Sequence, residues 1–201
     1  MDILATLIQN YGLIAICLII FAETGLLVGV FLPGDTLLFL AGIYSAKGAF
    51  PLWELIVFVS IAAILGDSSG YYIGRKLGKE IFTKGDNFIF SRKRLKSAAD
   101  FYEKHGPKTL IAARFIGFLR TFAPVIAGVV KMKYHTFLKY NIVGAVLWVI
   151  FISLLGYFLG SKFAPIINYL DLAVLVISLS SVVIAIIAGI LRLVKNRRTT
   201  V

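Results

Sequence analysis

The sequence predicts an all-α, polytopic membrane protein with two inverted-repeat halves, each a re-entrant hairpin followed by a transmembrane helix, and a C-terminal transmembrane helix. Three observations predict this fold class: an apolar composition, interruptions in two apolar runs, and an internal repeat. Hydrophobic residues make up 59% of the 201 residues and charged residues 15%, whereas soluble domains have about 45–50% and about 25%. The mean hydropathy is +0.91. This composition excludes a soluble enzyme and a disordered chain.

Six apolar runs follow one another along the chain, and a membrane-spanning helix needs about 20 such residues. They cover residues 3–22, 36–46, 55–74, 109–130, 140–161 and 172–191. The first run spans the membrane, lies at its surface or forms one arm of a hairpin, and the sequence leaves these alternatives open. We predict a single membrane domain over residues 1–201. Its first part is a hairpin and span at 12–74, followed by a cytoplasmic basic amphipathic segment at 75–108. A second hairpin and span then covers 109–163, and a C-terminal span covers 171–192.

Two of these segments are interrupted and do not read as simple spans. Proline removes a helix hydrogen bond and glycine favours turns. Non-helical backbone at membrane depth survives only where it is buried in protein or faces a water-filled cavity. We therefore expect two re-entrant hairpins, with Pro124 and two arginines interrupting the second. The residues expected to set the hairpin geometry are Pro33, Gly34, Gly117 and Pro124.

The distribution of basic residues predicts the orientation of the chain in the membrane. Residues 75–108 hold 10 basic and 4 acidic residues, and the tail at 192–198 adds four basic residues to the net charge of +11. Basic residues accumulate on the cytoplasmic side. If 109–130 crossed the membrane fully, the lysines at 131–139 and the tail would lie outside, whereas a re-entrant segment keeps all of them inside. The basic surplus thus reports on topology and predicts a cytoplasmic C-terminus. Nucleic acid is not an expected partner.

An internal repeat supports two related halves. An ungapped shift of 86 residues gives 11 identities over the 37 positions from 41 to 77. It aligns Ala41-Gly42 with Ala127-Gly128, and Gly70-Tyr71 with Gly156-Tyr157. Each half then consists of a broken hairpin and a span, and the predicted topology makes the halves inverted. Inverted repeats with broken helices near the midplane are a transporter architecture.

The polar segment between the halves contains a helix signal of its own. Ser91 is a suitable N-cap, and Gly106-Pro107 ends the pattern. Leu95, Ala98 and Tyr102 share one face, with basic residues around the rest. This pattern predicts a basic amphipathic helix on the inner leaflet, and the alternative is a solvated loop helix without a lipid role.

Five charged side chains lie inside the apolar runs or at their mouths: Glu23, Asp35, Asp67, Arg114 and Arg120. Each charge costs about 2.5–3.5 kcal/mol at the bilayer centre, so we expect the acids and arginines to neutralise each other across the repeat interface. On one continuous helix the two arginines would point about 120° apart, and a break near Gly117 would let both converge.

The chemistry of these side chains favours a phosphate site. Arginine presents a fork of donors that matches a phosphate group, so Arg114 and Arg120 are the candidate ligands of a lipid phosphate. Glu23, Asp35 and Asp67 are candidates for a proton relay or for charge balance. Two alternatives stay open: the ion pairs only hold the hairpins together, or Asp67 belongs to a packing patch of small residues.

Motifs of other function classes are missing from the sequence. Cys17 is the single cysteine, so an internal disulfide and a thiolate metal cluster are excluded. His105 and His135 are far apart and belong to no metal-binding pattern. The chain contains no nucleophile-elbow or P-loop motif. We therefore expect no enzyme, no metal and no cofactor.

The charged motifs and their spacing resemble those of the DedA family of bacterial membrane proteins over residues 12–163. The resemblance rests on Phe21-Ala22-Glu23, Pro33-Gly34-Asp35, Gly66-Asp67, and the run from Arg114 to Arg120 followed by Pro124. It implies two facing re-entrant hairpins and a role in lipid translocation, linked in some members to undecaprenyl phosphate or phosphatidylethanolamine and to the proton motive force. It also implies that the family's essential acids correspond to Glu23 and Asp35, and its essential arginines to Arg114 and Arg120.

The leading hypothesis is a flippase-type transporter that moves undecaprenyl phosphate or a phospholipid, coupled to the proton motive force. The alternatives are a proton- or sodium-coupled antiporter of small cations or drugs, and a non-transporting membrane assembly factor. The expected partners are membrane lipids and protons or sodium ions, with a homo-oligomer left open. The expected location is the inner (plasma) membrane.

Overall fold

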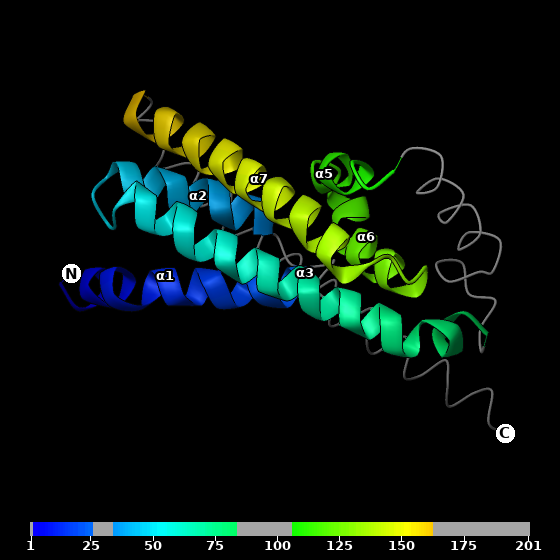
Figure 1. Ribbon diagram of the computed structural model, residues 1–201. Coiled ribbons are helices and arrows are strands. Elements are labelled where there is room, and N and C mark those ends of the chain that lie inside the picture. Colours follow the sequence, from blue (N-terminus) through cyan, green and yellow to red (C-terminus); the bar gives the residue numbers. More distant parts are fainter. Residues whose placement is uncertain (1, 26–33, 84–105, 163–201) are drawn as a thin grey trace, which may run out of the picture.

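The computed structural model describes residues 2–25, 34–83 and 106–162, and this part of the chain is all-helical, as the sequence predicts (Figure 1). Its helices are α1 (Asp2–Gly25), α2 (Gly34–Ala46), α3 (Leu52–Thr83), α5 (Thr109–Arg114), α6 (Gly117–Val129) and α7 (Tyr134–Lys162). Pro33, the predicted amphipathic helix at 91–105 and the predicted C-terminal span lie outside the described residues.

Two of the described helices are long and apolar enough to cross a membrane, over Leu52–Lys76 of α3 and Tyr134–Ser161 of α7. They correspond to the predicted runs at 55–74 and 140–161 but extend beyond them. Helix α3 starts early because the carbonyl of Pro51 accepts the amides of Glu54 and Leu55 at 3.1 and 3.3 Å. Hydropathy therefore located the apolar centre of each helix, whereas local hydrogen bonds decide where the helix begins.

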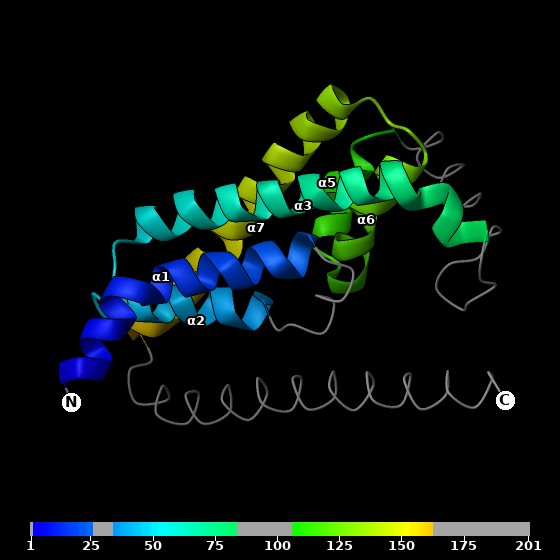
Figure 2. The ribbon, with the colours of Figure 1, turned by 90° about the horizontal axis from the view of Figure 1, so that it is seen from below.

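The short helices pack crosswise on the long ones. Helix α2 packs mainly on α7, α6 mainly on α3, and α1 along α3, as the two views of the ribbon show (Figures 1 and 2). Glycines allow these close approaches. A Cβ at Gly42 of α2 would lie 2.4 Å from the carbonyl oxygen of Ser153, and one at Gly128 of α6 would lie 2.0 Å from that of Tyr71. Helices α2 and α6 thus each meet the long helix of the other half of the sequence repeat.

Two apolar clusters hold this arrangement together. The larger lies between α1, α2, α3 and α7 and includes Ile20, Leu38, Val59 and Trp148. The smaller joins α3 to α5, α6 and α7, and the stacked rings of Tyr71 and Phe137, whose centroids lie 4.7 Å apart, form its centre. The charged side chains at membrane depth lie among the same helices.

The interruption that the sequence predicted in the second apolar segment does not lie at Pro124. Helix α5 ends at Arg114, Ile116 is extended with φ −112° and ψ 105°, and α6 then runs from Gly117 through Pro124 without ending. A proline inside a helix can kink it without ending it, and here the change of chain direction comes from the extended residue Ile116. The break at 115–116 thus separates the two arginines, next to the position that the sequence indicated.

Candidate functional site

Arg120, in the first turns of α6, joins two acidic residues from different helices. Its Nη2 donates to Oε1 of Glu23 on α1, and its Nη1 donates to Oδ1 of Asp35 on α2, each at 2.5 Å. The side chains of Arg120 and Glu23 are both 4% exposed, whereas that of Asp35 is 49% exposed. One guanidinium thus binds a buried carboxylate and a half-exposed one, and Asp35 marks the side on which this group opens to its surroundings.

Arg114, the last residue of α5, forms the second ion pair. Its Nη1 donates to Oδ2 of Asp67 on α3 and, at 2.7 Å, to Oδ1 of Asn141 on α7. The amide of Asn141 is held in turn, because its Nδ2 donates to the carbonyl of Ile64 at 3.3 Å. All three polar side chains are buried. Removing one partner of such a buried pair costs about 3–5 kcal/mol, since a buried charge is left alone.

Trp148 of α7 lies between the two ion-pair groups. The Arg120 guanidinium carbon is 4.7 Å from the centroid of the indole, and that of Arg114 is 5.8 Å away, within range for cation–π attraction. The indole Nε1 also donates to Oδ1 of Asp35 at 2.9 Å, the same oxygen that Arg120 contacts. A single aromatic side chain therefore links both arginines and the exposed acid.

The resulting site, which we call the charge cluster, contains Glu23, Asp35, Asp67, Arg114, Arg120, Asn141 and Trp148. Each of the six described helices contributes at least one of these side chains. With all groups ionised, two arginines and three carboxylates leave one net negative charge. Arg120 faces two of the three acids, so the excess lies on its side of the cluster.

The charge cluster has unused donors but little room. Among the described residues, Arg114 Nε and Nη2 and Arg120 Nε are buried without a hydrogen-bond partner. The cavity that both arginines line, with Asp67 and Asn141, measures only about 10 Å³, which is the space of about one water molecule. In this conformation the site is closed around its own side chains, and a phosphate group does not fit between them.

Gly34 is the tightest point of the charge cluster. It begins α2, and a Cβ placed on it would lie 1.5 Å from Oε2 of Glu23. A side chain at position 34 would displace this carboxylate, so glycine suits the start of α2. Gly117 is likewise the first residue of its helix, α6.

The structure brings together all five charged residues that the sequence singled out. Asp67, one of whose predicted alternatives was a packing patch, is fully buried and paired with Arg114. Sequence reasoning missed Asn141 and Trp148. The indole of Trp148 is 2% exposed, packs in the larger apolar cluster and donates to Asp35. A lone amide inside an apolar run was the available signal for Asn141, because polar residues inside transmembrane segments are rare and usually functional.

The site shows no metal-binding arrangement in the part of the chain that the structure describes, since no three His, Cys, Asp or Glu side chains are grouped to hold an ion. The site consists of guanidinium groups paired with carboxylates. An anion that approaches the arginines must compete with the three carboxylates for the same donors.

Comparison with known proteins shows which sequences this chain is similar to. The sequence model of the VTT domain matches residues 32–158. Protein DedA of Escherichia coli strain K12 is 40% identical over 200 residues, which cover 97% of this chain and 89% of that protein.

Two further relatives match a shorter part of the chain. The inner membrane protein YqjA of the same strain is 38% identical over 142 residues, 71% of this chain and 64% of YqjA. The uncharacterized membrane protein Rv0364 of Mycobacterium tuberculosis is 46% identical over 148 residues, 73% of this chain and 65% of that protein. No solved structure matches the chain significantly.

Proposed function

Because this chain belongs to the DedA family of VTT-domain membrane proteins, we propose that it transports a phosphate-containing lipid, undecaprenyl phosphate or a phospholipid, across the inner (plasma) membrane. In this proposal Arg114 and Arg120 bind the phosphate and the proton motive force drives the cycle. The observation that carries it is a pair of buried arginines whose donors are only partly used by the protein. Buried charge of this kind at membrane depth marks substrate pathways.

The phosphate and the carboxylates compete for Arg120. Both terminal nitrogens of this guanidinium now contact acids, Nη2 on Glu23 and Nη1 on Asp35. A phosphate needs the same fork of donors for a bidentate contact. Lipid binding therefore requires at least one acid to release Arg120, and the released acid then lacks its partner.

Proton uptake resolves this competition. A proton on Glu23 or Asp35 removes the excess negative charge of the cluster and weakens the hold of that acid on Arg120. Asp35, with a side chain that is 49% exposed, is the acid through which protons enter, and Glu23 receives them in the interior. Phosphate binding and protonation thus favour each other, which couples the movement of the lipid to that of protons.

The cavity of about 10 Å³ requires that the site opens during the cycle. Helices α2 and α6 have 13 residues each, about 20 Å at 1.5 Å per residue, which is less than the roughly 30 Å of a hydrocarbon core. We propose that both are arms of re-entrant hairpins and that they move relative to α7 and α3, with the C-terminus cytoplasmic. The glycine contacts support inverted repeats, since Gly42 against Tyr157 and Gly128 against Tyr71 are the same pair under the shift of 86 residues.

The test is lipid translocation in proteoliposomes that contain fluorescently labelled lipid and a pH gradient. Wild type should move the labelled head group, Arg114→Ala should not, and Glu23→Gln should translocate without responding to the gradient. Lys47→Ala is the matched control because Lys47 is exposed and outside the charge cluster.

The other outcomes separate the remaining hypotheses. A pH change driven by sodium or a drug, without lipid movement, would identify a cation antiporter, which the net negative charge of the cluster would suit. Neither activity, with binding to a membrane partner intact, would identify an assembly factor. Either result refutes the lipid transporter.

A further inference from the structure

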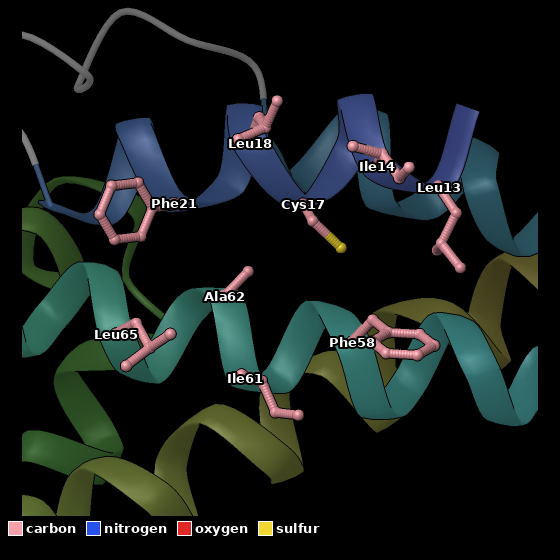
Figure 3. Close-up of a pocket in the computed structure, with 9 residues that line it drawn as sticks. All are labelled: Leu13, Ile14, Cys17, Leu18, Phe21, Phe58, Ile61, Ala62 and Leu65. Carbon is pink, nitrogen blue, oxygen red and sulfur yellow. The ribbon is translucent and has the colours of Figure 1, made fainter. Parts of the chain in front are cut away.

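Two apolar grooves lie on the outer faces of the long helices. One, of about 380 Å³, runs between α1 and α3, where Cys17 points from α1 toward α3 (Figure 3). The other, of about 470 Å³, lies on α7. Its walls include the exposed side chains of Phe115, Leu147, Phe151, Leu155 and Phe158. Both volumes fall in the range of small-molecule sites, 300–1,000 Å³, and do not separate the two grooves. The grooves differ in their position relative to the charge cluster.

The groove on α7 adjoins the charge cluster. Phe115, one of its lining residues, directly follows Arg114, and its ring meets that of Phe151 at 6.2 Å. Leu147 and Phe151 lie on the same side of Trp148, about 100° and 60° from it around the helix. Trp148 contacts Asp35, the exposed acid of the cluster.

The groove between α1 and α3 is separated from the charge cluster. Phe21 is two positions from Glu23, and Leu65 is two positions from Asp67, so each points about 160° away from its acid. The helices also close on each other here, because a Cβ at Gly25 would lie 3.0 Å from the carbonyl oxygen of Gly66.

We propose that the groove on α7 binds one hydrocarbon chain of the lipid whose phosphate reaches Arg114 and Arg120. This inference rests on the proposed function and adds the site of the chain. From Leu147 to Phe158 the groove extends over 11 residue steps of the helix, about 17 Å at 1.5 Å per residue, close to the half-thickness of a roughly 30 Å hydrocarbon core. A chain in this groove lies along one leaflet while its head group is at the cluster.

The guanidinium of Arg114 favours a lipid over a protein segment as the occupant of the groove on α7. Arg114 has two buried guanidinium nitrogens without a partner among the described residues, and Phe115, which lines the groove, follows it in the chain. An apolar groove beside unused cationic donors matches an amphiphile with an anionic head. The run at 172–191 of this chain is also apolar and long enough to cover a groove, but it carries no charge to meet those donors.

The test uses a fluorescent reporter in each groove of the full chain in phosphatidylcholine vesicles. Cys17, the single native cysteine, reports on the groove between α1 and α3. In a Cys17→Ser background, Leu155→Cys reports on the groove on α7. The quenchers are phosphatidic acid with brominated chains and diacylglycerol with the same chains and no phosphate.

At position 155 half-maximal quenching should require about tenfold less phosphatidic acid than diacylglycerol, the ratio expected from one charge-assisted hydrogen bond of about 1.5 kcal/mol. At Cys17 the two lipids should quench equally. The preference at position 155 should disappear in Arg114→Met/Asp67→Leu, which removes the buried pair together so that no charge is stranded.

Three outcomes would overturn the chain site. These are equal quenching by both lipids at position 155, a preference that survives the double substitution, or protection of position 155 from both lipids, which would indicate that 172–191 covers the groove. Because quenching measures binding alone, absence of translocation with the preference intact would refute the transporter and leave the chain site standing.

Discussion

Gly34→Ala tests whether the contact between α2 and the Glu23 carboxylate is essential to the charge cluster. The added Cβ would lie 1.5 Å from Oε2 of Glu23, and real Cβ contacts are not shorter than about 3.0 Å, so one of the two groups must shift by about 1.5 Å. Glu23 is 3% exposed and cannot turn into open space. The carboxylate therefore leaves Arg120, whose Nη2 now lies 2.5 Å away.

The expected loss follows from that one hydrogen bond. A hydrogen bond to a charged group contributes about 1.5–3 kcal/mol, which corresponds to a roughly 10- to 150-fold slower translocation if it is needed in the rate-limiting step. Overpacking adds about 1–3 kcal/mol of destabilisation. Thermal unfolding in detergent and head-group translocation in proteoliposomes measure the two effects separately.

Gly70→Ala is the matched control, since its nearest neighbours lie at 3.6 Å, an ordinary van der Waals contact; it should fold and translocate like wild type. If the alanine at position 34 acts through Glu23, it should cost little more in a Glu23→Ala background, because the clashing group is gone. Wild-type translocation by Gly34→Ala, or independent losses that add in the double variant, would refute this reasoning.

Three further substitutions separate the roles of the other side chains. Trp148→Phe keeps the aromatic face but loses the hydrogen bond to the Asp35 carboxylate, so translocation should fall roughly 10- to 150-fold if that bond is needed in the rate-limiting step; unchanged transport would exclude a role for the indole N–H. Asp67→Leu strands Arg114 and should lower the unfolding free energy by about 3–5 kcal/mol. Adding Arg114→Met should restore thermal stability without transport, and restored transport would mean that this pair is only structural. Asn141→Leu leaves Arg114 without its amide acceptor and should cost about 1–3 kcal/mol in thermal unfolding, with an unchanged midpoint arguing against that contact.

Much of the fold and of the candidate site was predictable from local sequence. The apolar runs predicted α3 and α7, and the Pro-Gly-Asp segment predicted an interruption before α2, because hydropathy and backbone restrictions act over a few residues. The five charged residues of the site were recognisable one by one, since a charge inside an apolar run is costly wherever it lies. The break between Arg114 and Arg120 was expected near Gly117, and it lies directly before that residue, over 115–116.

The pairing of those charges depended on the tertiary structure. In the sequence Arg120 lies 97 positions from Glu23 and 85 from Asp35. The local sequence does not predict that Arg120 pairs with both of these acids and that Arg114 pairs with Asp67. That choice follows from α6 packing on α3 and α2 on α7, through glycines that bring the backbones into contact. The same packing brings Asn141 and Trp148 into the charge cluster, and nothing in the local sequence says which charged residues they meet. The sequence by itself determined which residues carry charge into the membrane and where the helices break. Only the crosswise packing decided which charges meet, because ion pairing is a property of distance in space.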